Sequence, residues 1–189
     1  MQSQDKYRLS LLGAMAIALH VMERLIPSPI PWLRLGLANI ITLVALFLYG
    51  FRGAFTITLI RVLAGSLLTG TFLGPPFALS LAGGILSVSA MSVARRIFRG
   101  IFGPLGLSLI GALFHNLAQI LVAYLLFIHN FRSLAVITPF ILFLGTITGT
   151  INGIAAVFLL DGLQKSLDNM QNNQSEESQD NGLHNIKVR

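Results

Sequence analysis

The chain has 189 residues, of which 54% are hydrophobic and 11% are charged, and its mean hydropathy is +0.76. A soluble domain carries roughly 25% charged residues, so this composition excludes a soluble globular protein. The net charge of +6 does not indicate nucleic-acid binding, because the basic residues stand at the ends of apolar stretches, as membrane orientation signals do. Cysteine is absent, which excludes disulfides, thiolate metal sites and cysteine nucleophiles.

Six apolar stretches follow one another from about Leu9 to Leu160. About 20 apolar residues cross the ~30 Å core of a bilayer as a helix, so each stretch is predicted to span the membrane. The sequence therefore predicts an all-α integral membrane protein with six transmembrane helices in a compact bundle. The expected spans cover residues 9–26, 36–49, 54–73, 77–93, 104–128 and 136–160.

Proline and glycine mark the links between these spans. Three prolines within residues 27–31 end the first span, because proline lacks the amide donor that a helix needs. The glycine-bounded sequence 50–53 predicts a tight turn between the second and third spans. Residues 74–76, Gly-Pro-Pro, predict the turn into the fourth span, and a basic loop with three arginines follows that span.

The composition changes from Asp161 onward. Residues 171–180 contain only Asn, Gln, Ser and acidic residues. Such a segment cannot bury enough apolar surface to offset its ordering entropy. We therefore predict a transmembrane domain over residues 1–163 and a disordered polar tail over residues 164–189.

The distribution of lysine and arginine predicts the orientation of the chain. With the N-terminus in the cytoplasm, nine basic residues lie on the inner side and three on the outer side. The inner residues are Lys6, Arg8, Arg52, Arg95, Arg96, Arg99, Lys165, Lys187 and Arg189, and the outer ones are Arg24, Arg34 and Arg132. This bias predicts a multi-pass protein of the plasma membrane with both termini in the cytoplasm.

Arg61 lies in the third expected span, ~12 Å from its start at 1.5 Å per residue. An arginine in hydrocarbon costs at least about 2.5–3.5 kcal/mol unless it is paired or hydrated, so it is a functional candidate by default. Three interpretations remain open. Arg61 binds a ligand or counter-ion, or it joins two helices through an ion pair or a carbonyl, or its side chain extends toward the cytoplasmic surface.

A second polar group lies at the outer end of the first expected span. His20 and Glu23 are three residues apart and so share a helix face, and Arg24 follows them. Arg34 lies beyond the proline-rich link. Glu23, Arg24 and Arg34 are candidates to bind a ligand in a cavity open to the outside, whereas ordinary interfacial polarity is enough to explain His20.

His115, Asn116 and Gln119 form a polar stripe near the middle of the fifth expected span. Such side chains can hydrogen-bond a ligand, but they also join helices at about 0.6–2 kcal/mol each. Asn39 in the second span and Asn152 in the sixth raise the same two alternatives.

Small residues at helical spacing predict close approach between helices. Gly145, Gly149 and Gly153 form two overlapping GxxxG units, which we interpret as packing within the bundle. Ala14 and Ala18 form an Ala-xxx-Ala face in the first span, which is a candidate surface for a partner protein.

Motifs for catalysis are missing from the sequence. It contains no HExxH, no GxSxG and no GxxxxGK[ST] motif. Its four aspartates are scattered, and none forms the paired acidic cluster that holds Mg²⁺ against a diphosphate. We therefore expect no catalytic residue, no metal site and no cofactor.

Two segments and one arginine carry a family resemblance. The stretch Trp32–Ile41 (WLRLGLANII), the turn Tyr49–Ala54 (YGFRGA) and Arg61 resemble the membrane family described as heptaprenyl diphosphate synthase component I, or Gx transporter. More loosely, the chain is similar to the substrate-binding S components of energy-coupling factor transporters, which carry a basic residue in the third span and an Ala-xxx-Ala face in the first. The resemblance covers about residues 9–160, and the motif from Arg34 to Asn39 is fairly specific for the first family.

The S-component resemblance implies a subunit that binds a small organic molecule, such as a vitamin or an isoprenoid or quinone precursor, from outside. It implies docking on a transmembrane coupling subunit driven by two ATPases, with Ala14 and Ala18 facing that partner. It also implies that Arg34, Asn39 and Arg61 lie in or near the binding region. No ligand signature of any one vitamin transporter is present, which leaves the substrate open.

The synthase label of the first family implies a different function, in isoprenoid or quinone-chain synthesis beside a soluble prenyltransferase. Because paired aspartates are missing, this chain would then be a non-catalytic membrane subunit. A scaffold for a membrane redox complex is a third class, which no cofactor ligand pattern supports. For a binding function, the excess of arginine around Glu23 predicts a ligand with negative charge.

Overall fold

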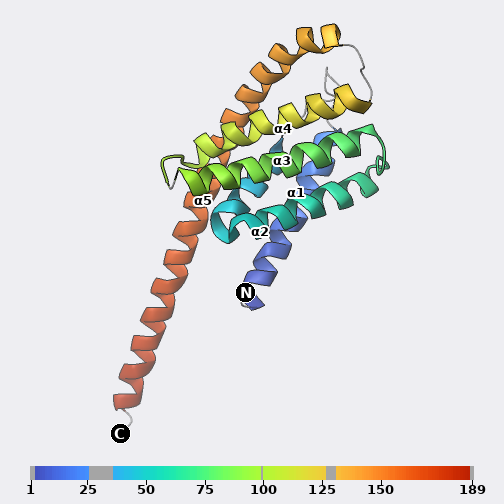
Figure 1. Cartoon of the computed structure of the whole chain (residues 1–189). Coiled ribbons are helices and arrows are strands. Elements are labelled where there is room, and N and C mark those ends of the chain that lie inside the picture. The colour runs from blue at the N-terminus through green and yellow to red at the C-terminus, as the bar shows by residue number, and fades with distance from the viewer. Residues whose placement is uncertain (1–2, 26–35, 99, 127–130, 188–189) are drawn as a thin grey trace. The chain divides into compact units, whose positions relative to one another are not determined.

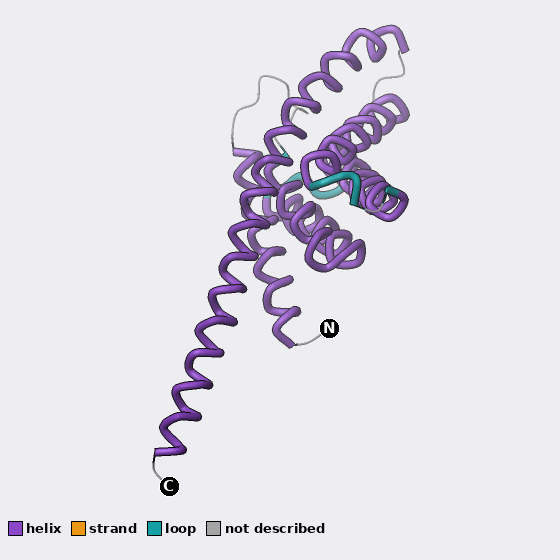
Figure 2. Tube along the Cα trace, turned by 90° about the vertical axis from the view of Figure 1, so that its left-hand side faces the viewer, coloured by secondary structure: helices purple, strands orange, loops and turns teal. Residues whose placement is uncertain are grey.

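The computed structural model describes residues 3–25, 36–98, 100–126 and 131–187. All regular secondary structure in this part of the chain is helical (Figure 1, Figure 2), which confirms the predicted all-α class. The five helices are α1 (Ser3–Leu25), α2 (Leu37–Leu68), α3 (Pro75–Ile97), α4 (Pro104–Leu126) and α5 (Phe131–Lys187).

The predicted number of six spans is wrong. Among the described residues, four helical segments are long and apolar enough to cross a membrane, as expected of a multi-pass membrane protein. They are Leu37–Leu68, Pro75–Ile97, Pro104–Leu126 and Ala135–Ser166. The difference arises at α1, which is not one of them, and at α2, which contains both the second and the third expected span.

Helix α1 falls short because charged residues lie near both of its ends. The uncharged run between Arg8 and Glu23 covers only residues 9–22. That run rises about 21 Å as a helix, which is less than the ~30 Å hydrocarbon core.

Helix α2 is folded back on itself at Gly50. This residue has φ 68° and ψ −165°, a conformation that is essentially restricted to glycine. Thr42 Oγ1 and Thr58 Oγ1 lie 3.4 Å apart, although 16 residues of a straight helix would separate them by about 24 Å. Helix α2 therefore consists of two antiparallel arms, residues 37–49 (the first arm) and 51–68 (the second arm), and the predicted turn is confined to Gly50.

Arg95, near the end of α3, binds the end of the first arm of α2 just before the reversal at Gly50. Its guanidinium donates hydrogen bonds to the carbonyls of Leu46 and Phe47, and it lies 4.5 Å from the centroid of the Phe47 ring. The last carbonyls of a helix have no partner within the helix, and a basic side chain can satisfy them. Arg95 therefore caps the first arm where Gly50 ends it.

Replacing Arg95 by glutamine should lower the stability of the fold by about 1–3 kcal/mol, because two helix-end carbonyls lose a charged donor. Thermal unfolding in mild detergent measures the effect. Arg96→Gln is the matched control, since Arg96 is the exposed neighbour with no hydrogen bond or ion pair to the described residues. Equal melting of the two variants would contradict the capping role.

Glycines bring the helices of the bundle into close contact. A Cβ at Gly65 of the second arm would lie 2.4 Å from His20 Cδ2 of α1. A Cβ at Gly111 of α4 would lie 2.7 Å from the sulfur of Met91 in α3. Each glycine therefore admits a side chain of the neighbouring helix at a distance that any larger residue would block.

The GxxxG face of α5 packs against α4, as predicted. Ser108 donates a hydrogen bond of 2.7 Å to the carbonyl of Gly149. A Cβ at Gly153 would lie only 2.8 Å from the Cα of Leu105. The small residues serve close backbone approach in this part of the bundle.

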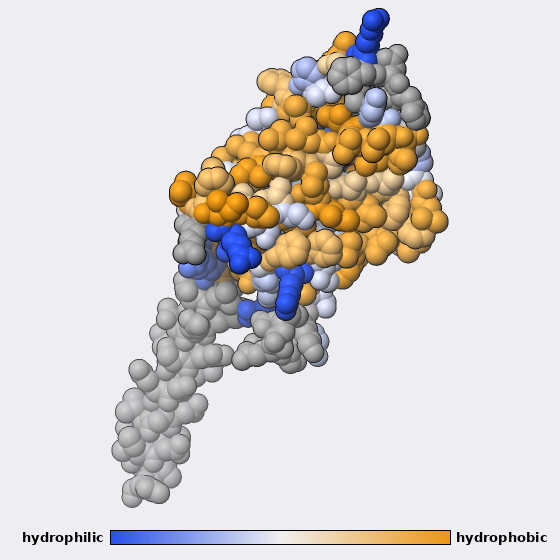
Figure 3. Space-filling model, viewed as in Figure 1, coloured by the Kyte–Doolittle hydropathy of each residue, from blue (hydrophilic) through white to orange (hydrophobic). Residues whose placement is uncertain are grey.

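The outer surface of the bundle is apolar. Figure 3 shows large hydrophobic areas over α3 and α4, with strongly hydrophilic residues along the lower margin of the hydrophobic area and at the top of the molecule. Large side chains such as Leu121, Val136 and Phe143 are more than half exposed. A contiguous apolar exterior of this size is typical of a surface that faces lipid.

The chain divides into two compact units, residues 1–156 and residues 157–189. The second unit contains the remainder of α5, which stays helical to Lys187. The predicted division at residue 164 into a transmembrane domain and a disordered polar tail stays a prediction. Residues 164–181 contain neither proline nor glycine, so nothing in this polar sequence interrupts a helix that enters from the apolar side.

Candidate ligand-binding site

Polar side chains from three helices meet around the first residue of α2. We call this group the polar cluster, and it consists of Glu23 of α1, Asn39 and Arg61 of α2, and Asn152 of α5, arranged around Gly36 and the α2 N-terminus. Glu23, Arg61 and Asn152 are each less than one tenth exposed. In a bundle with an apolar exterior, such a group needs an explanation.

Gly36 and Leu37 are the backbone anchors of the cluster. Gly36 has φ 71° and its carbonyl accepts a hydrogen bond of 3.1 Å from Asn152 Nδ2. The amide of Leu37 donates to the Glu23 carboxylate. A carboxylate at a helix N-terminus satisfies a free amide and interacts favourably with the helix dipole. Glu23 therefore fixes the end of α1 to the start of α2.

Arg61 and Asn39 join the two arms of α2. Arg61 Nη2 donates a hydrogen bond of 2.6 Å to Asn39 Oδ1, and Arg61 is only 4% exposed. Counted from residue 51, Arg61 lies about 15 Å along the second arm, near the middle of a ~30 Å core. One of the three interpretations from sequence, in which the Arg61 side chain extends toward the cytoplasmic surface, is therefore wrong.

Helix α3 packs against the second arm beside Arg61. A Cβ at Gly84 would lie 2.7 Å from Thr58 Cγ2 and 3.8 Å from Arg61 Nη2. The adjacent Gly83 receives the imidazole of His115 from α4, with the nearest ring atom 2.7 Å from a Cβ placed there. Two consecutive glycines thus admit Thr58 of α2 and His115 of α4 at neighbouring positions of α3, and Arg61 lies at ordinary contact distance from Gly84.

The three residues of the α4 stripe do not act together. Asn116 lies against Gly145 and donates a hydrogen bond of 3.3 Å to the carbonyl of Ile141, so it joins α4 to α5. Gln119 is half-buried. Of the three residues, only His115 lies near Arg61. Its imidazole packs against Gly83, and the next residue, Gly84, lies beside Arg61.

Two predicted ligand contacts fall outside the described part of the chain. They are Arg34 and the side chain of Arg24. The Ala-xxx-Ala face on α1 is described, and both Ala14 and Ala18 are exposed on it while Ala16 between them is fully buried.

Asn152 and Gly36 belong to the cluster, although no pattern in the sequence joins them. Their contact spans 116 residues of chain, so no local spacing relates them. One signal was available, since Asn152 adjoins the glycine face of the sixth expected span.

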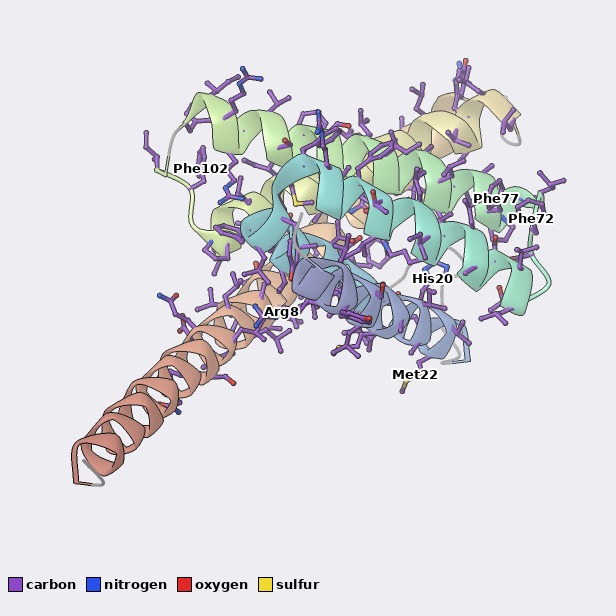
Figure 4. The ribbon with its side chains drawn as sticks, turned by 90° about the horizontal axis from the view of Figure 1, so that it is seen from below. Arg8, His20, Met22, Phe72, Phe77 and Phe102 are labelled. Carbon is purple, nitrogen blue, oxygen red and sulfur yellow. The ribbon has the colours of Figure 1, made fainter. Side chains whose placement is uncertain are left out.

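His20 is 2% exposed against Gly65, and so it is a packed residue of the α1–α2 contact, pointing from α1 toward α2 (Figure 4).

The cluster itself contains one acidic and one basic side chain, Glu23 and Arg61, in a stretch of sequence where arginine predominates. Between Glu23 and Asp161 the sequence contains no aspartate and no glutamate. The same stretch contains eight arginines, namely Arg24, Arg34, Arg52, Arg61, Arg95, Arg96, Arg99 and Arg132. Within the described residues no group of three or more His, Asp or Glu side chains could hold a metal ion. The arrangement offers hydrogen-bond donors, with one buried guanidinium, that of Arg61, and one buried carboxylate, that of Glu23.

A family model described as heptaprenyl diphosphate synthase component I matches residues 12–159 of the chain. This range includes every residue of the polar cluster. No curated protein and no solved structure matches the chain at a significant level.

Proposed function

The chain belongs to the heptaprenyl diphosphate synthase component I family, and from this premise we propose that it is a membrane-embedded subunit that binds a small organic anion at the polar cluster. In this proposal the subunit acts like an S component, receiving its ligand from outside and working with a transmembrane coupling subunit and ATPases. In this proposal the chain is a multi-pass protein of the plasma membrane, and both of its termini face the cytoplasm.

One observation carries the proposal, which is the buried Arg61–Asn39 pair inside a helix that is long and apolar enough to cross a membrane. Ionisable residues inside a membrane are costly and mark ligand or ion pathways in most membrane proteins. A guanidinium has five donors in a planar fork, which suits a carboxylate or phosphate group. The Asn39 bond holds that fork in one orientation.

A purely structural role for the cluster is the competing explanation. A hydrogen bond between helices needs one donor and one acceptor, and neutral side chains supply these elsewhere in this chain, as Thr42 and Thr58 do. A charged group in the same place costs more to bury than a neutral one. The use of arginine at this position therefore favours a ligand with negative charge. His115 lies close by, against Gly83 of α3, and is a second side chain that can donate a hydrogen bond.

The proposal is tested by native mass spectrometry of the full chain, purified from its own membranes in mild detergent. We expect a bound species of constant mass on the wild type. Arg61→Gln should retain roughly 10–100-fold less of it, because a charge-assisted hydrogen bond is worth about 1.5–3 kcal/mol. Arg132→Gln removes the same charge from an exposed position at the start of α5 and should keep the bound species.

Equal retention by folded Arg61→Gln protein would remove the basis of the proposed site. Thermal unfolding of each variant, measured beside the mass spectra, separates lost binding from lost folding. A bound species that carries no acidic group would contradict the proposed anion while leaving a binding function in place.

A second candidate follows from the printed description of the family, in which the chain assists heptaprenyl diphosphate synthesis. The scarcity of acidic side chains supports a non-catalytic part in such a complex, because Mg²⁺-diphosphate chemistry needs clustered carboxylates. Co-purification distinguishes the two functions. A coupling subunit with an ATPase pair supports uptake, with the exposed Ala14–Ala18 face as the proposed contact, whereas a soluble prenyltransferase supports the second candidate.

A further inference from the structure

Arginines from three helices gather at the end of the bundle opposite to the polar cluster. Arg8 precedes Leu9, whose Cδ1 lies 3.5 Å from a Cβ placed at Gly53, so the residue before Gly53, Arg52, lies beside this part of α1. Figure 4 places Arg8 and Phe102 toward one end of the bundle and Phe72 and Phe77 toward the other.

The end of α3 joins the same region. Arg95 contacts Leu46 and Phe47, which directly precede the break at Gly50, and Arg96 is the next residue. We call the three exposed arginines Arg8, Arg52 and Arg96 the basic patch. Strongly hydrophilic residues are visible along this edge of the apolar surface in Figure 3.

The members of the basic patch differ from Arg95 in what they contact. Arg95 is engaged with the first arm of α2. Within the described part of the chain, Arg8, Arg52 and Arg96 make no hydrogen bond and no ion pair. Because no acidic residue occurs between Glu23 and Asp161, helices α2, α3 and α4 supply no carboxylate to neutralise Arg52 and Arg96, whereas Asp5 lies three residues before Arg8 on α1.

Exposed apolar side chains accompany these arginines. Ile97 is 66% exposed, Phe98 44% and Ile101 78%, all in or next to the link between α3 and α4. The rings of Phe98 and Phe102 lie 5.0 Å apart in an edge-to-face arrangement. Apolar and aromatic side chains beside arginine are typical of segments that enter the boundary between lipid headgroups and acyl chains.

We propose that the basic patch is a binding site for the phosphodiester headgroups of anionic phospholipids in the adjoining leaflet. Arginine suits this partner because its guanidinium can bind two phosphate oxygens at once. The apolar side chains at residues 97–101 contact the acyl chains of the same lipids. An acidic protein would also satisfy the charge, but it would leave these apolar side chains without a partner at lipid depth, so the observations favour the lipid. The site is independent of the polar cluster and of any ligand that binds there.

The test titrates phosphatidylglycerol and, separately, phosphatidylcholine into the full-length protein in a neutral detergent and follows the thermal midpoint. Phosphatidylglycerol should raise the midpoint, and phosphatidylcholine should not. One basic residue near an anionic surface is worth about 1 kcal/mol, or roughly fivefold in affinity. Arg96→Gln should therefore weaken the phosphatidylglycerol effect about fivefold, and the Arg52→Gln, Arg96→Gln double variant about 25-fold.

Arg132→Gln is the charge-matched control and should respond to phosphatidylglycerol as the wild type does, because Arg132 follows the far end of α4. High salt should reduce the wild-type response. Midpoints measured without added lipid check that each variant is folded. Three results would overturn the inference. The first is an unchanged response to phosphatidylglycerol in the folded double variant, and the second is an equal response of the wild type to phosphatidylcholine. The third is a double variant that binds lipid as the wild type does but no longer co-purifies with an acidic protein.

Discussion

Gly50→Ala is expected to disrupt both the fold and the polar cluster. Alanine avoids the φ and ψ of Gly50, at a cost of about 1–3 kcal/mol. It also favours a helix that continues through the position. In a straight helix Asn39 and Arg61, 22 residues apart, would be separated by about 33 Å instead of sharing a hydrogen bond of 2.6 Å. Binding at the cluster should be lost as the two arms separate.

The absence of cysteine makes this prediction measurable with a single cross-link. Thr42→Cys combined with Thr58→Cys places two sulfurs where hydroxyl oxygens lie 3.4 Å apart, close enough for a disulfide after a small adjustment. We expect rapid disulfide formation in the otherwise unchanged chain and roughly 5–150-fold less when Gly50→Ala is added, which corresponds to about 1–3 kcal/mol.

Gly13→Ala is the matched control for Gly50→Ala. A Cβ at Gly13 would meet nothing within 4 Å, and its backbone is that of the α1 helix. This control should leave cross-linking unchanged and the stability equal or slightly higher. Undiminished cross-linking in Gly50→Ala protein would show that the hairpin does not depend on the glycine.

Asn39→Leu is the second substitution with a large expected effect. Leucine has a similar size but removes the acceptor of a buried guanidinium hydrogen bond. Interhelical hydrogen bonds in membrane proteins average only about 0.6 kcal/mol. Here the donor is charged and buried, so we expect a loss of about 2–3 kcal/mol in the free energy of unfolding.

Thr42→Val separates the effect of charge from that of any lost hydrogen bond. Thr42 lies one turn further along the same arm and bonds Thr58 on the same partner arm, but both groups are neutral. Its replacement should cost under about 1 kcal/mol. Unfolding in mild detergent, followed by circular dichroism, compares the two variants. An Asn39→Leu protein as stable as Thr42→Val would mean that Arg61 does not depend on Asn39.

The helices of this protein could be located from the sequence with good accuracy, because apolar runs and their glycine and proline boundaries act locally. Expected spans 77–93 and 104–128 correspond to α3 and α4, and the turn at Gly50 is present. The number of spans could not be fixed in the same way. Hydropathy alone does not reveal that two expected spans fold back within α2, whereas the short uncharged run of α1, residues 9–22, can be read from the sequence.

The candidate site was only partly predictable for a related reason. Arg61, Glu23 and Asn39 stand out as polar residues in apolar surroundings, and the cluster contains all three. His115 and Asn116 are neighbours in sequence, yet their side chains contact different helices. Which side of α4 each residue faces depends on how α3 and α5 pack against it.

The sequence by itself determined that the chain is helical, largely apolar and rich in arginine at the ends of its apolar stretches, because composition and local periodicity are enough to specify these properties. Only the tertiary structure decided which polar residues meet. A reversal at Gly50 brings Asn39 to Arg61, and the packing of α5 brings Asn152 to Gly36 across 116 residues. Contacts between distant segments depend on backbone geometry at a few glycines, and that geometry is settled by packing rather than by local preference.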